Sequence, residues 1–442
     1  MKKVFAGIVL ILLVAGFCAP VINGVVMEKI IKKVYQDINT LHADTGSDVS
    51  VEIIKYERSL YSSAIKWKVN LQNMKAAYGV DEIVFTDEVA HGLLGVTSTT
   101  SMAENNWYSD FVKNKLGGKD PLHIVTEYKL LGDITSTVAL DAFVLESEGK
   151  TFDVQPAKVI TAFDKNLINF TTEASWDGLS LPDEVALGKM TLDSRLGKIS
   201  TYIWDGDVSY AAKDGWAVEN GERVEFVNII NKYKLSYDKK KNSLSVQLSA
   251  GADVMKAGDD EIDDAFVRVG MRNMDGTAYE ECMHLYAKSV SKFMEEIAAA
   301  GDDPEKMKAV VDKQTATLGG KAMAAYEKLL KKDLEFFVSD LRARVKTGDI
   351  EGDFLLRLNK DMTFMQFFPI MGQPSLVVDI FSLKSSLSLP AELAGDDPTL
   401  LAPLYPGMQT GFFEKDGKYL RHKAETKDGK LFLNGKEVML QQ

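Results

Sequence analysis

Residues whose types could support catalysis or metal binding are few and widely spaced. The 442-residue chain has five histidines, and none lies in a His-Glu-x-x-His motif or in a Cys/His spacing typical of zinc sites. Glu281 and His284 stand three residues apart, as in di-iron helix bundles, but such a site needs a second Glu-x-x-His, which the sequence lacks. We therefore expect a pair on a helix surface here. The histidines are His42, His91, His123, His284 and His422.

Two acidic clusters could hold calcium, which prefers several oxygen ligands. Residues 257–266 read AGDDEIDDAF, and their spacing is not that of an EF-hand. Asp205 and Asp207 stand in the stretch WDGDVSY, which is typical of a turn. We interpret both clusters as solvated loops. Because no Gly-x-Ser-x-Gly or phosphate-loop motif occurs either, the sequence predicts no catalytic residue, no metal, no cofactor and no enzymatic activity.

Composition narrows the class of partner. The net charge of −12 argues against nucleic acid, which binds basic surfaces. Hydrophobic residues make up 45% of the chain, as in ordinary folded proteins. Cys18 and Cys282 fall in an apolar segment and in a helical region, so we expect no disulfide between them.

The amino-terminal residues 4–26 carry no charge and follow Lys2 and Lys3. As a helix they would extend roughly 34 Å, enough to cross the hydrocarbon core of a bilayer. A cut after Ala19, or lipidation of Cys18, would place bulky Phe17 where a small residue is usual. We expect an uncleaved single-pass anchor, with cleavage and lipidation as alternatives. Lysines flank both sides of the segment, but a short tail before a signal-like stretch favours an exported body.

Periodicity divides the rest of the chain. Residues 27–48 show apolar side chains at three- and four-residue steps, typical of an amphipathic helix, which we expect to pack on its own domain. Residues 49–276 change to a two-residue period with frequent turns, so short connections should pair the strands antiparallel. Residues 133–146 and 232–250 are the clearest cases, the second being two strands around a charged turn.

Helical periodicity returns in residues 277–332, with a helix start at residues 302–306 and a break expected at Leu318–Gly320. Residues 333–442 alternate again, including a strand at residues 375–393. The predicted fold is α+β: an amino-terminal transmembrane helix over residues 1–26, the helix of residues 27–48, and a body dominated by long antiparallel sheet with a helical insertion.

Motifs at both ends resemble the YdgA family of bacterial envelope proteins. Near the start, Tyr56, Arg58, Leu60, Ser62 and Ser63 match that family's motif, with Ser59 where Gly is usual and Tyr61 where Phe is usual. Near the end, Asn434 and Gly435 match its Asn-Gly-Lys turn. The resemblance covers nearly the whole chain. It implies a protein anchored in the inner membrane with a periplasmic body, and it implies no catalytic residues.

The strand of residues 62–71 raises the question of function, because Ile65, Trp67 and Val69 share one apolar face. One hypothesis is an open, sheet-lined groove that binds lipid or another apolar ligand. In the alternative, the helices of residues 277–332 and the carboxy-terminal sheet cover this face, and the protein is a structural or assembly factor that docks another envelope protein. The partners implied are the membrane, through the amino-terminal helix, and a lipid or an envelope protein. The sequence does not give the oligomeric state.

Overall fold

The computed structural model describes residues 2–44, 49–71, 80–102, 105–129, 132–147, 149–219, 221–300, 304–366, 376–394 and 411–439. The chain forms two compact units. Unit 1 comprises residues 1–182, 191–202 and 286–313, and unit 2 comprises residues 183–190, 203–285 and 314–442.

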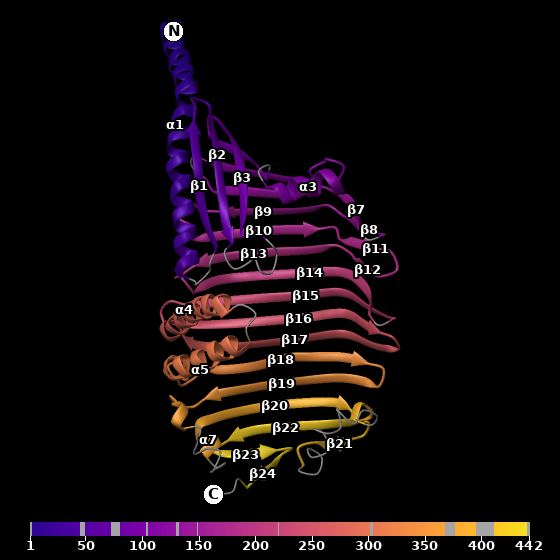
Figure 1. Ribbon diagram of the computed structural model, residues 1–442. Helices are drawn as coiled ribbons and strands as arrows, with labels where there is room; N and C mark the ends of the chain where they lie inside the picture. The colour runs from indigo at the N-terminus through magenta and orange to yellow at the C-terminus, as the bar shows by residue number, and fades with distance from the viewer. Residues whose placement is uncertain are drawn as a thin grey trace. The chain divides into compact units, whose positions relative to one another are not determined.

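Unit 1 begins with α1 (Lys2–Asp44), a single helix of 43 residues (Figure 1). The uncharged stretch and the amphipathic stretch are therefore continuous in one helix, which is described to Asp44; residues 45–48 of the predicted range lie outside the described residues. No helix within the described part of the chain combines the length and apolarity needed to span a membrane.

In the main sheet of unit 1, neighbouring strands pair antiparallel. Three shorter strands pair separately in the order β7–β8–β11. The helix α3 (Asn106–Lys115) follows β4. The strands of the main sheet, in spatial order, are β1 (Val49–Arg58), β2 (Ser62–Leu71), β3 (Glu82–His91), β4 (Gly95–Ser101), β5 (Leu122–Lys129), β6 (Ile134–Leu140), β9 (Ala157–Phe163), β10 (Asn169–Trp176) and β13 (Met190–Lys198). The short strands are β7 (Phe143–Ser147), β8 (Lys150–Val154) and β11 (Leu179–Leu181).

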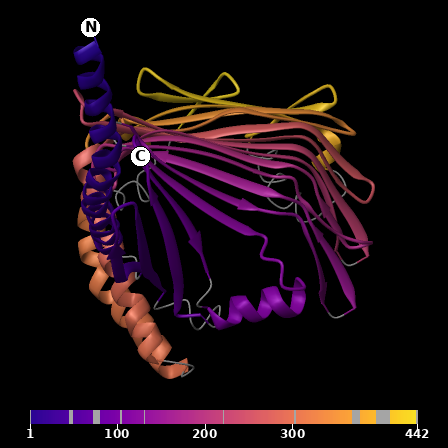
Figure 2. The ribbon, with the colours of Figure 1, turned by 90° about the horizontal axis from the view of Figure 1, so that it is seen from above.

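Unit 2 is a longer antiparallel meander in which consecutive strands are spatial neighbours. Figure 2 shows its long strands bending at one end. A short strand, β12 (Val185–Leu187), pairs with β14, and β21 (Glu414–Asp416) pairs with β22. The strands in order are β14 (Trp204–Glu219), β15 (Glu222–Asp238), β16 (Ser243–Ala257), β17 (Asp260–Asp275), β18 (Glu335–Val345), β19 (Gly348–Leu358), β20 (Phe381–Pro390), β22 (Tyr419–Lys427), β23 (Lys430–Leu433) and β24 (Lys436–Val438).

Two helices, α4 (Gly276–Ala300) and α5 (Pro304–Glu327), separate β17 from β18 in the sequence. The break predicted at Leu318–Gly320 is wrong, because α5 continues through both glycines. The strand predicted at residues 375–393 is shorter than expected. Its first part is the helical turn α7 (Val377–Ile380), and its end is the 3₁₀ turn η3 (Ala391–Ala394). A second 3₁₀ turn, η1, spans Phe364–Gln366.

Each unit has its own hydrophobic core. In unit 1, Met27 and Ile31 of α1 pack on Ile65, Val89 and Val96 of the sheet, all at most 3% exposed. This packing confirms that the amphipathic part of α1 lies on its own domain. In unit 2 the largest cluster of buried residues comprises Ile203, Leu244, Met274, Leu334, Leu358, Met362 and Ile380.

Candidate functional site

The apolar face of β2 is covered by α1. Ile65 is 1% exposed beneath Met27 and Ile31, while Trp67 and Val69 are half-buried. Trp67 stacks on Phe85 at 4.4 Å between ring centroids and lies 5.5 Å from the Tyr35 ring of α1. The cover predicted from residues 277–332 and the carboxy-terminal sheet is therefore incorrect at Ile65. A helix that precedes the strand in sequence supplies the apolar surface instead.

A buried carboxyl group lies beside this face. The Nε1–H of Trp67 donates to Asp87 at 3.0 Å, and the Thr100 hydroxyl donates to the same oxygen at 2.7 Å. Burial raises the pKa of Asp87, and these hydrogen bonds offset part of the rise because they favour the charged form. Asp87 fixes the Trp67 ring between α1 and the sheet.

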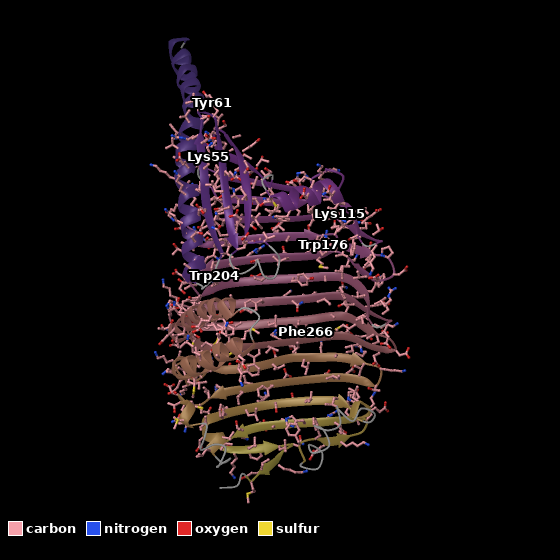
Figure 3. The ribbon with its side chains drawn as sticks, viewed as in Figure 1. Lys55, Tyr61, Lys115, Trp176, Trp204 and Phe266 are labelled. Carbon is pink, nitrogen blue, oxygen red and sulfur yellow. The ribbon has the colours of Figure 1, made fainter. Side chains whose placement is uncertain are left out.

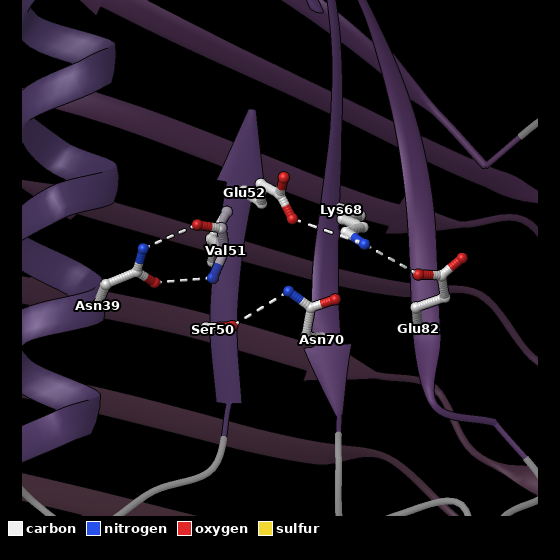
Figure 4. A network of polar contacts seen from close by, with 7 residues as sticks. All are labelled: Asn39, Ser50, Val51, Glu52, Lys68, Asn70 and Glu82. Atoms are coloured by element: carbon white, nitrogen blue, oxygen red, sulfur yellow. Dashed lines mark hydrogen bonds and ion pairs between the residues drawn. The ribbon is translucent and has the colours of Figure 1, made fainter. Parts of the chain in front are cut away.

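Polar contacts attach α1 to the edge strand β1. Asn39 of α1 donates to Val51 O at 2.8 Å and accepts from Val51 N at 2.7 Å, so its amide acts as a strand partner (Figure 4). Further along the same face, Lys68 lies 3.5 Å from Glu52 and 3.2 Å from Glu82. An edge strand that would otherwise expose its backbone is thus closed by a helix side chain.

The amino-terminal motif residues on β1 contact the same helix. Arg58 Nε lies 3.5 Å from Glu28 Oε2 of α1, and Lys32 Nζ lies 5.5 Å from the centre of the Tyr56 ring. Ser59 N donates to Ser62 O at 2.8 Å and closes the β1–β2 turn, with Leu60 exposed at its tip. Ser59 does not adopt a positive φ, so a serine is tolerated where the family uses glycine.

Ser63 forms a buried pair with His91. The Ser63 Oγ and His91 Nε2 atoms are 2.9 Å apart, and both residues are less than 9% exposed. His91 Nδ1 faces the Leu60 carbonyl at 3.4 Å. A Cβ on Gly24 of α1 would overlap the His91 ring, so the helix backbone closes over it. The motif around Ser63 therefore packs the helix against the two hairpins.

The carboxy-terminal motif lies beside a second pair of the same kind in unit 2. Ser385 Oγ lies 2.8 Å from His422 Nε2, and His422 Nδ1 donates to Phe412 O at 3.0 Å. Asn434, with φ of 50°, donates to Gly411 O and Phe412 O and accepts from Lys423 N. Gly435 follows with φ of 78°, completing a turn that favours Asn-Gly. Asn434 thus holds the carbonyl that orients His422.

Neither Ser–His pair has the surroundings of a nucleophilic site. A nucleophile needs a base and also room for a substrate. Here Ser63 is buried and Ser385 is half-buried, and in both pairs a backbone carbonyl takes the position of the acidic group of a triad. No group of three potential metal ligands occurs among the described residues. Glu281 pairs with Lys328 at 2.6 Å.

A groove in unit 2 was not predicted. It has a volume of about 950 Å³ and is lined by residues of the six strands β14 to β19. Its floor includes Phe266, labelled in Figure 3, between two arginines: the Arg342 and Arg268 Cζ atoms lie 4.6 and 5.9 Å from the ring centre. Ile230 and Lys232 of β15 line the same groove.

Glycines give the aromatic rings of this sheet their position. Gly251 pairs with Phe266 across strands, and Gly270 pairs with Phe337. A Cβ on Gly251 would lie 2.9 Å from Phe266 Cδ2, and a Cβ on Gly270 would lie 2.6 Å from Phe337 Cζ. Each ring lies over the bare backbone of its neighbour, and Arg272 covers the Phe337 ring at 4.0 Å. A glycine within a strand permits such close approach, and the arginine above the ring adds a cation–π contact.

The charged side chains that line the groove differ in how fully they are paired. Arg344 holds Asp264 at 3.2 Å and Asp349 at 3.3 Å, and Asn228 holds Asp253 at 2.6 Å. Arg268 binds Asp340 at 2.8 Å, yet its buried Nε–H has no acceptor in the described structure. Arg342 forms no ion pair with any described residue. Arg342 and Arg268 therefore retain donors for a ligand.

Sequence signals for the groove were present but ambiguous. An isolated glycine within a strand pattern, as at Gly251 and Gly270, indicates a close approach or a bulge. The interpretation of the acidic run of residues 257–266 as a loop is wrong, because residues 260–266 lie in β17, Ala257 ends β16, and only residues 258–259 form the turn. Pairing those residues with Arg342 and Arg344 requires knowledge of β18, more than 70 positions away in the sequence.

Comparison with known proteins gives a family and no relative of known function. A family model described as "Bacterial protein of unknown function (DUF945)" matches residues 1–441. No curated protein and no solved structure matches the chain.

Proposed function

The chain belongs to the DUF945 family of bacterial proteins of unknown function, and for this member we propose a non-enzymatic, ligand-binding role in the cell envelope. The ligand is an extended amphiphile with an acidic group, such as a lipid, and it lies in the groove of unit 2. The observation that carries this proposal is the stack of Arg342 on Phe266 beside Arg268 in a groove of about 950 Å³.

The chemistry of the stack suits such a ligand. Arg342 and Arg268 offer N–H donors to a carboxylate or phosphate, while Phe266 and Ile230 offer apolar surface to a chain. A guanidinium group that stacks on an aromatic ring keeps the N–H donors in its own plane free for bidentate contacts. The Ile65–Trp67–Val69 face, which first suggested a groove, is occupied by α1, so the ligand is assigned to unit 2.

The cellular setting is part of the proposal. The uncharged residues 4–26 anchor the chain in the inner membrane with a single pass, and the body lies in the periplasm. The YdgA-like motifs at Tyr56–Ser63 and Asn434–Gly435 support this setting. Extraction of membranes at alkaline pH should leave the chain in the pellet, and a protease added to the periplasm should digest the body. Release into the supernatant would contradict the anchor.

The groove is tested on the full chain purified from bacterial membranes in mild detergent. Lipid extraction and native mass spectrometry should find one acidic amphiphile per protein. Loss of a charged hydrogen-bonding partner costs about 1.5–3 kcal/mol, so Arg342→Glu should reduce ligand occupancy at least about tenfold. Phe266→Ala should act in the same direction.

The matched control is Arg223→Glu. Arg223 also stacks on an aromatic ring, Trp216 at 4.3 Å, and lies outside the groove. This variant should keep its ligand. A chain that carries no ligand, or an Arg342→Glu variant with undiminished ligand, overturns the proposal.

One observation favours docking of another envelope protein as a second candidate function. Met323 and Tyr326 of α5 are 46% and 48% exposed, and such residues are enriched at interfaces. A photo-crosslinker at position 326 should then capture one defined envelope protein in cells, whereas the same crosslinker at exposed Val218 should not.

A further inference from the structure

Two hairpin tips of unit 1 meet α1 at Asn23. This asparagine is 1% exposed and donates from Nδ2 to Gly92 O at 2.8 Å and to Leu93 O at 2.9 Å. The β3–β4 turn is closed by Gly92 N donating to Gly95 O at 2.8 Å. His91 N donates to Tyr61 O at 2.9 Å, which joins the β1–β2 turn to the same place. The two tips are thus fixed to the helix and to each other.

Large apolar side chains gather at this end of unit 1 and point to solvent. Their exposed fractions are 58% for Ile22, 60% for Leu60, 43% for Tyr61, 56% for Leu93 and 83% for Leu94. Residues 59–65 and 89–101 contain no Asp, Glu, Lys or Arg. Figure 3 shows Tyr61 beside α1 near the end of the sheet that the helix extends beyond. An apolar, charge-free patch fixed by buried hydrogen bonds indicates an interaction surface.

The helix identifies the occupant of this surface. The uncharged residues 4–22 directly precede Asn23, and nineteen helical residues extend roughly 28 Å, close to the thickness of a bilayer core. A helix inserted over that length places Asn23 at the boundary between hydrocarbon and headgroups. The hairpin tips held by Asn23 then lie at the same depth, where a tyrosine and leucines are favourable.

We propose that the β1–β2 and β3–β4 tips, through Leu60, Tyr61, Leu93 and Leu94, insert into the headgroup region of the membrane that holds α1. The lipid surface is a second contact of unit 1 and fixes the direction in which this unit leaves the bilayer. This inference rests on the anchor of the proposed function and is independent of the groove.

The test uses the full chain with Cys18→Ser and Cys282→Ala, reconstituted in nanodiscs of phosphatidylethanolamine and phosphatidylglycerol. A nitroxide is attached at Leu94→Cys. Its relaxation by dissolved oxygen should exceed that by a water-soluble nickel complex, as for a lipid-exposed site. The matched control is Ile199→Cys, 48% exposed in the same unit and outside the tips, which should respond to nickel.

A charge in the neighbouring position tests the same contact. Leu93 is exposed, so Leu93→Glu should keep the fold, which near-ultraviolet circular dichroism checks, and should move the Leu94 label toward the aqueous response. If the chain stays in the nanodisc but the label at position 94 is relaxed by the nickel complex as strongly as the label at position 199, the inference is overturned and the anchor is not. A chain that does not enter the nanodisc overturns both.

Discussion

At the scale of single residues, the two Ser–His pairs are structural contacts in different units. In each pair the histidine stands two positions away from the strand partner of the serine: Ser63 pairs with Val89, and Ser385 pairs with Ala424. A carbonyl oxygen can only accept, so Nδ1 of His422 carries a proton, and Nε2 of the neutral ring accepts from Ser385. His91 shows a looser version of the same arrangement.

Removing one hydroxyl should loosen α1. Ser63→Ala leaves buried His91 Nε2 without its partner, which costs about 1–3 kcal/mol. Because His91 lies against Gly24 of α1, limited proteolysis should cut at Lys32 and Lys33 faster than in the unchanged chain. Ser385→Ala makes the same chemical change in unit 2 and should leave those sites protected. Equal cleavage in both variants would refute a role for Ser63 in holding the helix.

Asp87 should make the stability of unit 1 depend on pH. Its pKa is raised in the folded state, so the folded state favours the protonated form. The contribution of Asp87 is fully present below its unfolded pKa of about 3.9 and is lost as the pH rises through the folded value. Asp87→Asn cannot ionise and keeps an oxygen for Trp67 and Thr100. The difference in Tm between Asp87→Asn and the unchanged chain should therefore shift in favour of the variant as the pH rises from 4 to 7. A constant difference would contradict the assignment.

The sequence motifs identified one residue at each Ser–His pair: Ser63 itself in unit 1, and in unit 2 Asn434, which holds the carbonyl that His422 contacts. The local spacing of the histidines matches no metal motif and does not indicate either pair. Ser63 and His91 lie 28 positions apart in the sequence, and Ser385 and His422 lie 37 apart. Strand register alone brings them together, and register depends on turn lengths that periodicity does not define.

At the scale of elements, the close approach of strand and ring should make Gly270 intolerant of a side chain. The Cβ of Gly270→Ala would lie 2.5 Å from Val246 O and 2.6 Å from Phe337 Cζ, so the pairing of β16, β17 and β18 must shift. Overpacking of this kind costs about 1–3 kcal/mol. Urea unfolding should show the loss. Gly132→Ala meets only the flexible side chain of Lys129 and should change stability little. Similar stability of the two variants would contradict the stacked geometry.

Periodicity predicted element type well and element ends less well. Two-residue alternation and short turns correctly predicted antiparallel strands, as in β15 and β16 for residues 232–250. Residues 133–146, where the two-residue alternation is clear, form two strands, β6 and β7, with residues 141–142 between them. The break expected in α5 is absent because two glycines lower helix propensity by only about 1 kcal/mol each, which the surrounding helix can overcome.

At the scale of the whole molecule, each unit has a separate core, so unfolding should show two transitions. Ser63→Ala should lower the Tm of one transition, and Gly270→Ala should lower that of the other. Differential scanning calorimetry of the two variants and of the double variant distinguishes the units. A single transition that both substitutions shift equally would show that the cores unfold together.

The sequence was enough to predict the fold class, but not which element covers the apolar face of β2. Antiparallel sheet follows from local pattern, and the structure confirms it. Which element covers Ile65 depends on how a helix folds back on strands that follow it, and several apolar helices in the sequence could compete for that place. The groove was not predictable, because its lining comes from six strands, β14 to β19, whose register includes several β-bulges.

The order of the strands bears on how this chain acquires its structure. From β14 to β20 each strand pairs with the strand synthesised just before it. Within the described residues, α4 and α5 stand between β17 and β18, and the short turns η1 and α7 stand between β19 and β20. When the chain emerges with its amino end first, each new strand can therefore pair with the edge of the sheet that has already formed. Pairing of these strands does not depend on a segment that has yet to emerge. Assembly can proceed one row at a time, on a ribosome or at the exit of a translocation pore, with only the newest edge open to mispairing. In a sheet of this order, duplication of a hairpin would lengthen the sheet without changing how the other strands are connected.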